Sequence, residues 1–228
     1  MSVRVLDVWK EYVMGTTSTL ALRGVTLEVR AGEFVAITGP SGSGKSTLTY
    51  LISALDVPTK GKVEVDGTVV SELNEGQRSA WRRRNVGMIF QFFHLLPTLT
   101  ALENVMFSME LAGIRGDLRS RALEFLDFVG LREKANRFPF ELSGGEQQRV
   151  AIARAISMDP KIVVADEPTA FLDRENKLKV MELLRKVNER GKTVIFTTHD
   201  LELAAFAERR VRLVDGQVAG EERSGRAR

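Results

Sequence analysis

The sequence predicts an α/β fold with a mostly parallel sheet core, an N-terminal antiparallel β-subdomain and an inserted α-helical subdomain. Alternating apolar and polar residues at 3–9 and 20–30 are typical of half-buried antiparallel strands. Residues 92–159 have a wholly helical pattern. From residue 160 onward, short apolar runs again alternate with helical segments, which favours a parallel sheet.

The length of 228 residues suits one sizeable domain with an insertion. We expect a single domain over 1–228, whose core comprises 1–91 and 160–228. The helical subdomain is expected over 92–159.

The elements of the first half follow from local signals. We expect a buried strand at 34–38, a helix at 45–54, a hairpin at 62–70, a polar helix ending near 84 and a short strand at 86–90. Asp66-Gly67 is a typical two-residue hairpin turn. Ser71 is the expected N-cap of the polar helix.

The second half begins with three predicted helices. Thr100 to Glu103 is a capping box that opens the first, the second covers 118–129 and stops at Gly130, and the third begins after Ser143. The remaining elements are expected at 162–165 (strand), 174–190 (helix), 193–197 (strand), 201–207 (helix) and 211–214 (strand). The charged residues 221–228 are expected to form a frayed tail.

Composition excludes several classes of protein. No run approaches the roughly 18 apolar residues of a membrane span, and the N-terminus lacks a signal-peptide apolar core, so any membrane role must come through a partner. The absence of cysteine excludes disulfides, thiolate metal sites and a cysteine nucleophile. With 33 basic and 30 acidic residues, the short arginine clusters at 82–84, 209–210 and 223–228 are expected to be solvated surface rather than nucleic-acid sites.

A glycine-rich loop follows the strand at 34–38. It reads Gly39-Pro40-Ser41-Gly42-Ser43-Gly44-Lys45-Ser46-Thr47 and matches the pattern G-x-x-x-x-G-K-[ST]. Its glycines allow consecutive N–H groups to converge on a phosphate at the start of a helix. Lys45 then reaches the outer phosphates and the Ser46 hydroxyl ligates Mg²⁺. The alternative, an ordinary Gly/Ser turn, does not explain why a strand precedes the pattern and a helix follows it.

Two carboxylates end the apolar strand at 162–165. In a parallel sheet this strand ends at the edge that also carries the glycine-rich loop. Asp166 is therefore placed to hold Mg²⁺, and Glu167 to polarise a water aimed at a terminal phosphate. An Asp-Glu pair taken alone would equally fit a solvated turn.

Residues 142–149 begin a helix with an unusual first turn. Ser143 and Glu146 fit a capping box, which is a purely structural device. Gly144 and Gly145 weaken a helix by roughly 1 kcal/mol each relative to alanine, so we expect a ligand to approach their N–H groups. A phosphate is the obvious candidate, and the economical arrangement is a nucleotide shared between two subunits.

In these residues the chain resembles the nucleotide-binding subunit of an ABC transporter, over about residues 3–218. The resemblance rests on six motifs in order, namely 39–46, Gln91, 142–146, Asp166-Glu167, a loop ending in Asp173, and His199. It implies a P-loop NTPase fold with a RecA-like core, ATP and Mg²⁺ as ligands, and a head-to-tail homodimer around ATP.

The resemblance also implies residue roles. Glu167 would be the general base, with Lys45, Gln91 and His199 as the other catalytic residues. Ser46, Gln91 and Asp166 would hold Mg²⁺. ATP would contact Tyr12, residues 39–47, Ser143, Gly144, Gly145, Glu146 and Asp173, with Tyr12 stacked on adenine. Trp9 or simple packing is the alternative for Tyr12, helix capping is the alternative for His199, and His94 is expected to be structural.

Residues 91–105 resemble the macrolide-exporter and lipoprotein-release group in particular. That implies ATP hydrolysis that drives a separate membrane permease in export, lipoprotein release or mechanotransmission, with the chain on the cytoplasmic face of the cell membrane and no nucleic-acid partner. An amino-acid importer ATPase, or a soluble ABC ATPase acting on nucleic acid or in assembly, is the alternative. Phe171 departs from the small or polar residues that the family usually has there, close to the expected dimer seam.

Overall fold

The structure, a computed structural model, describes residues 2–223. Within these residues a six-stranded sheet has the order β10-β9-β3-β8-β7-β6, and its neighbours from β9 to β6 are parallel. Its strands are β3 (Phe34–Thr38), β6 (Val86–Ile89), β7 (Ile162–Ala165), β8 (Thr193–Thr198), β9 (Arg209–Val214) and β10 (Gln217–Arg223). The predicted α/β fold class is confirmed.

The N-terminal antiparallel sheet has the order β2-β1-β4-β5 in the part of the chain that is described. It consists of β1 (Ser2–Met14), β2 (Thr17–Arg30), β4 (Lys60–Val65) and β5 (Thr68–Val69). The first two strands are longer than predicted because they join directly in a hairpin, with Gly15 at φ 60° in its turn. Tyr12, which lies between the predicted strands 3–9 and 20–30, therefore belongs to β1.

The alternation of side chains along β3 divides the interior into two cores. Val35 and Ile37 face α1 (Lys45–Ile52) and the antiparallel sheet. Phe34 and Ala36 face the opposite core, which includes residues of the three helices α3 (Ala101–Leu111), α4 (Leu118–Phe128) and α5 (Gly144–Ile156) and of α6 (Arg174–Glu189). Because the central strands are covered on both faces, they read as continuous apolar runs.

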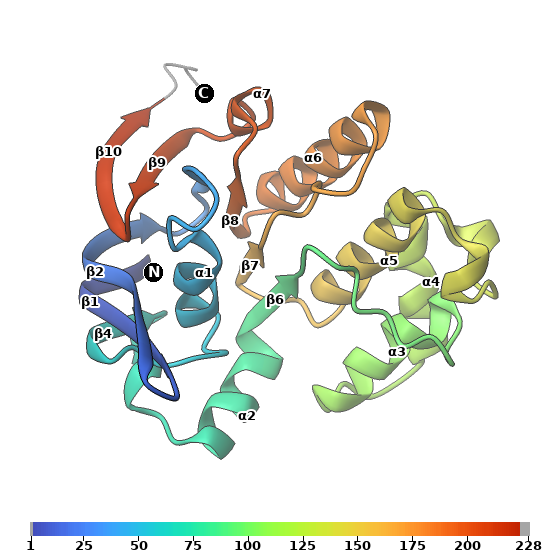
Figure 1. The fold of residues 1–228 in the computed structure, drawn as a ribbon. Helices are drawn as coiled ribbons and strands as arrows, with labels where there is room; N and C mark the ends of the chain where they lie inside the picture. Colours follow the sequence, from blue (N-terminus) through green and yellow to red (C-terminus); the bar gives the residue numbers. More distant parts are fainter. Residues whose placement is uncertain (1, 224–228) are drawn as a thin grey trace.

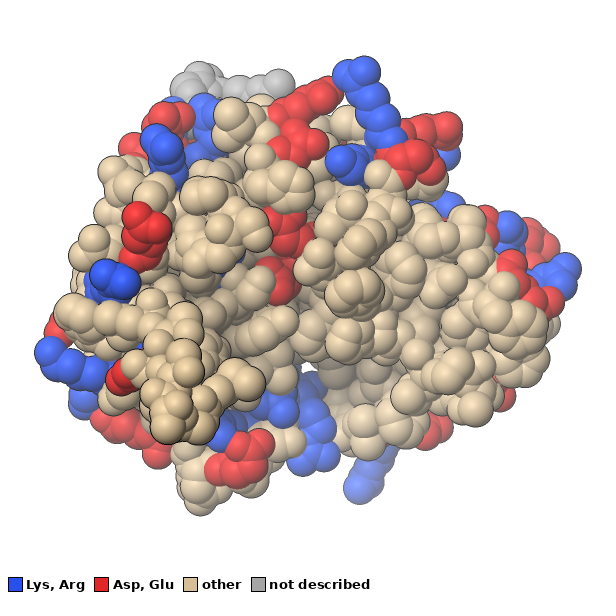
Figure 2. Space-filling view, viewed as in Figure 1, with Lys and Arg blue, Asp and Glu red and all other residues tan. Residues whose placement is uncertain are grey.

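Helices α3, α4 and α5 form a lobe at the side of the sheet, and α6 lies between that lobe and β8 (Figure 1). The expected capping boxes are present at Thr100 and at Ser143. In the same view, charged side chains of both signs are interspersed mainly around the rim, while the front of the helical lobe is largely uncharged (Figure 2).

Four local predictions are wrong. Ser71 is not a helix cap, because α2 (Glu75–Asn85) is capped by Asn74, whereas the Ser71 hydroxyl accepts from the Val63 amide. Helix α7 ends at Ala204 (Leu201–Ala204), earlier than expected. Residues 221–223 belong to β10 instead of a frayed tail, and 224–228 lie outside the described residues. Arg209 is buried at 7% exposure and not part of a solvated cluster, because it pairs with Glu33 and Glu221.

Candidate functional site

The glycine-rich loop connects β3 to α1, as predicted. Gly44 is the N-cap of α1, at φ 98°, and a Cβ there would lie 2.5 Å from the Ala21 carbonyl oxygen. A Cβ on Gly39, at φ 151°, would lie 2.0 Å from the Leu213 carbonyl oxygen. Any side chain at these positions would clash with backbone, so the loop requires glycine there.

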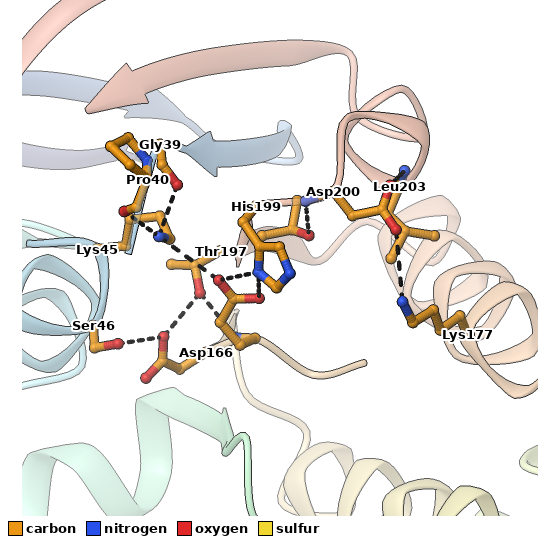
Figure 3. Close-up of polar contacts among 12 residues, drawn as sticks. Gly39, Pro40, Lys45, Ser46, Asp166, Lys177, Thr197, His199, Asp200 and Leu203 are labelled. Atoms are coloured by element: carbon orange, nitrogen blue, oxygen red, sulfur yellow. Dashed lines mark hydrogen bonds and ion pairs between the residues drawn. The ribbon is translucent and has the colours of Figure 1, made fainter. Parts of the chain in front are cut away.

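The Lys45 ammonium lies across the mouth of this loop (Figure 3). Its Nζ donates to the carbonyl oxygens of Gly39 and Pro40, each at 2.9 Å. It also lies 3.7 Å from Oε1 of Glu167. With 7% of Lys45 exposed, a buried positive charge is held where the loop turns.

Asp166 and Ser46 meet as the sequence predicted. The Asp166 carboxylate, 2% exposed, accepts from the Ser46 hydroxyl at 2.9 Å and from the Thr197 hydroxyl at 2.8 Å, both through Oδ1. A carboxylate and a hydroxyl are the hard oxygen donors that suit Mg²⁺, so the residues present fit this ion. Thr197 was missed by sequence reasoning, although its place at the end of an apolar strand was the available signal.

Glu167 is held in a strained position beside Asp166. Its φ of 43° is rare for a residue with a side chain, and strain of this kind clusters at functional sites. The Glu167 N–H donates to the Thr197 hydroxyl at 2.8 Å. His199 Nδ1 lies 3.2 and 3.1 Å from the two Glu167 carboxylate oxygens, so this histidine is turned toward the carboxylate (Figure 3). The cap of α7 is Asp200, which excludes the capping alternative for His199.

One cavity of about 530 Å³ brings these elements together. It is lined by Thr19, Leu20, Ala21, Ser41, Gly42, Gly44, Lys45, Ser46, Thr47, Gln91, Glu167 and His199. Its volume is within the usual range for small-molecule sites. Gly39, Pro40 and His199 also border a larger hollow of about 740 Å³ against β9 and β10, so the loop separates two depressions.

The turn at Ser143 lies elsewhere. Ser143, Gly144 and Gly145 are not among the described residues that line the cavity. A Cβ on Gly145 would lie 2.4 Å from the Asn176 side chain, whereas one on Gly144 would be 3.5 Å from Phe93. Helix packing thus accounts for Gly145 without any ligand, a reason that the sequence did not reveal.

Glu146 and Asp173 act as structural caps in this conformation. Glu146 accepts from the Ser143 N–H at 3.0 Å and pairs with Lys134. Asp173 accepts from the N–H of Asn176 at 2.9 Å and from its side-chain amide at 2.7 Å, and these hydrogen bonds lower the pKa of the Asp173 carboxyl. The expected contacts of both residues with ATP stay predictions.

Tyr12 lies at the rim of the cavity without lining it. Its partner across the β1–β2 hairpin is Thr19, a residue of the cavity wall. Its hydroxyl donates to Oδ2 of Asp56 at 3.0 Å. Trp9 is engaged elsewhere, because its indole N–H donates to Asp7 at 3.0 Å.

The chain is similar to known proteins over most of its length. Residues 22–170 match the family described as ABC transporter. The lipoprotein-releasing system ATP-binding protein LolD of Aquifex aeolicus is 47% identical, over 88% of this chain and 90% of that protein. The macrolide export ATP-binding/permease protein MacB of Chlorobium phaeobacteroides is 44% identical over 97% of this chain, which spans 34% of that protein.

A solved structure also matches. The dimeric, post-hydrolysis ATP-binding cassette MJ0796 of Methanocaldococcus jannaschii, bound to ADP and Pi, has a TM-score of 0.91 and 46% identity, over 97% of this chain and 98% of its own. The resemblance to the macrolide-export and lipoprotein-release group is confirmed by the relatives named above. The chain therefore belongs to the ABC transporter family, as an ATP-binding cassette that hydrolyses ATP.

Proposed function

We propose that the 530 Å³ cavity binds ATP with Mg²⁺, and that two copies of the chain hydrolyse it as a head-to-tail dimer that drives a membrane permease. The observation that carries the proposal is the convergence of Lys45, Ser46 and Glu167 on one cavity. A glycine loop, a buried cation and two carboxylates are the components that phosphoryl transfer requires.

Lys45 supplies positive charge for the outer phosphates. In the present conformation its ammonium is satisfied by the carbonyl oxygens of Gly39 and Pro40. Phosphate oxygens are stronger acceptors for a cation than neutral carbonyls, so ATP binding exchanges these partners. The loop N–H groups at the start of α1 add to this attraction.

Ser46, Asp166 and Gln91 are the residues that would hold Mg²⁺. The bond between the Ser46 hydroxyl and the Asp166 carboxylate already keeps the two oxygens together. The ion, when bound, neutralises charge on the phosphates. Gln91 also lines the cavity, in the loop that leads from β6 into the helical lobe.

Glu167 is the general base in this proposal. It accepts a proton from the attacking water, and its strained backbone aims the carboxylate into the cavity, at a residue exposure of 9%. His199 keeps both carboxylate oxygens in place through Nδ1, and we assign it a contact with the γ-phosphate when ATP is present.

The dimer would complete the site. The turn of Ser143, Gly144 and Gly145 lies at the N-terminus of α5, where N–H groups favour an anion, yet it is outside the cavity of its own chain. The helical subdomain, 92–159, would present this turn to the ATP of a second copy. The dimeric state of the MJ0796 cassette supports this arrangement.

The permease is inferred from the relatives. MacB is named as an ATP-binding and permease protein in one chain, and LolD as part of a lipoprotein-releasing system. In the described part of this chain, no helix has the length and apolar character that crossing a membrane requires. We therefore place the chain at the inner face of the cell membrane, bound to permease subunits of the export, lipoprotein-release or mechanotransmission type.

The test is the variant Glu167→Gln, which keeps the shape of the side chain but removes the base. We expect turnover to fall by at least about 100-fold, with ATP affinity retained and an ATP-dependent dimer in light scattering. Glu124→Gln, at an exposed position of α4, is the matched control and should behave as the parent chain. Normal turnover in Glu167→Gln would remove Glu167 from the role of base, and a monomer with bound ATP would contradict the dimer.

A further inference from the structure

Asp56 joins β1 to the helix that begins at the phosphate loop. Asp56 comes shortly after α1 in the chain. Its carboxylate accepts three hydrogen bonds, from Lys10 Nζ at 2.8 Å, from the Tyr12 hydroxyl at 3.0 Å and from the Val57 N–H at 2.7 Å. The segment after the helix is thereby tied to two residues of the same strand. No part of the proposed catalytic chemistry uses this cluster.

Lys10 is the second anchor of the cluster. Only 9% of the residue is exposed, and its ammonium also donates to the Val57 carbonyl oxygen at 2.8 Å. The same Nζ lies 4.8 Å from the centre of the Tyr12 ring, a cation–π distance. The Tyr12 side chain is therefore held at its hydroxyl by Asp56 and over its ring by Lys10.

The ring that is held in this way stands at the edge of the ATP cavity. Tyr12 is paired with Thr19 across the hairpin, and its hydroxyl also interacts with the Thr47 hydroxyl. Thr19 and Thr47 both line the cavity, and the ring itself stays partly exposed. A flat aromatic surface next to the phosphate loop is suited to stack on a nucleotide base.

A stacking surface binds well only if it is already in place, because ordering a free side chain costs part of the binding free energy. We propose that Lys10 and Asp56 are positioning residues that fix the Tyr12 ring as the platform for the adenine base. They set the affinity for the base and leave phosphate binding and hydrolysis to the loop. This inference rests on the proposed function and on the expectation, from the family resemblance, that Tyr12 stacks on adenine.

The chain contains a matched control cluster on the exposed side of β1. Asp7 accepts from the Trp9 indole and pairs with Lys60 at 3.3 Å, and Lys60 lies 5.7 Å from the Trp9 ring. These residues repeat the same three components, an acid, an aromatic ring and a lysine. Because Asp7 and Lys60 are exposed and absent from the described cavity lining, Asp7→Asn should leave nucleotide binding unchanged.

The experiment separates the base from the phosphates. In the variants Asp56→Asn, Lys10→Met and Asp7→Asn, KM and kcat are measured for ATP. The inhibition constant is then measured for inorganic tripolyphosphate, which carries the phosphates but lacks the base. We expect Asp56→Asn and Lys10→Met each to raise KM for ATP by roughly 10-fold, in the range of base stacking. Both should keep kcat within about 2-fold and leave the tripolyphosphate constant unchanged, since the loop is intact.

Tyr12→Ala distinguishes the two ways of failing. If Tyr12→Ala raises KM for ATP but Asp56→Asn and Lys10→Met do not, the inference is overturned and the adenine contact stands. If Tyr12→Ala has no effect on KM, the platform itself is absent, while turnover and the Glu167→Gln result still support the cassette. A parallel loss of tripolyphosphate binding would show that the cluster merely supports the loop, and would also overturn the inference.

Discussion

The ring of Phe171 stacks on the ring of Phe92, with centroids 4.9 Å apart and planes inclined by 27°. Phe171 lies in the loop after β7, which carries Glu167, and Phe92 follows Gln91 in the loop after β6. The unusual aromatic residue at position 171 therefore connects two loops that leave neighbouring strands of the sheet. Their neighbours in the chain, Phe93 and Leu172, both face Gly144 at the start of α5.

This contact predicts a measurable coupling between the two rings. In a double-mutant cycle with Phe92→Ala and Phe171→Ala, we expect an interaction free energy of about 0.5–1 kcal/mol, at the low end for aromatic pairs because both residues are more than half exposed. Urea unfolding of the four proteins measures it. As a control, the changes in unfolding free energy of Phe107→Ala, on α3, and Phe171→Ala should add. Additive changes in the cycle of Phe92 and Phe171 would contradict the coupling.

The packing of Gly145 predicts a difference between two adjacent glycines. Gly145→Ala places a methyl group within 2.4 Å of Asn176, whose side chain is bonded to Asp173, so the start of α6 must shift. We expect a loss of about 1–3 kcal/mol in the free energy of unfolding. A methyl group at Gly144→Ala meets only ordinary contacts, so this variant should change the free energy of unfolding by less than about 1 kcal/mol. Equal losses in the two variants would contradict the packing of Gly145 against Asn176.

These contacts show where sequence reasoning ends. The strands 34–38 and 162–165 were predicted to the residue, because continuous apolar runs and the following motifs define them. The carboxylates after 162–165 and the phosphate loop were placed at one sheet edge because parallel topology requires it. The partner of Gly145, 31 positions away, and the Lys10–Asp56 pair depend on how separate elements pack, which no local pattern encodes.

Asp56 predicts a dependence of stability on pH. Burial alone would raise the pKa of the Asp56 carboxyl, but hydrogen bonds from Lys10, the Val57 amide and Tyr12 outweigh it and hold the pKa below its usual value of 3.8. The folded state thus favours the ionised carboxylate. The contribution of Asp56 to the free energy of unfolding is therefore complete above the unfolded-state pKa and is lost as pH falls through the folded-state pKa.

The charged and titratable groups facing Asp56 are Lys10 and Tyr12, and burial raises the pKa of the Tyr12 hydroxyl, so Tyr12 stays protonated in this pH range. Asp56→Asn should therefore be less stable than the parent chain at pH 7, and the difference in unfolding free energy should shrink below about pH 4. Urea unfolding at several pH values measures this difference. A difference that stayed constant down to pH 3 would show that the carboxylate is not stabilised by its partners.

Arg209 stands next to Arg210 in the sequence but has different surroundings in the fold. Arg209 is buried and donates to Glu221 at 2.7 Å and to the Glu28 carbonyl oxygen at 2.7 Å, with Glu33 at 3.4 Å. The variant Arg209→Ala leaves the Glu33 carboxylate, whose side chain is only 11% exposed, without its cation. We therefore expect the free energy of unfolding, measured with urea, to fall by about 3 kcal/mol. Arg210→Ala removes a partly exposed pair with Glu222 and should cost less than about 1 kcal/mol. Equal losses would mean that Arg209 is a solvated residue after all, as its place in an arginine pair had suggested.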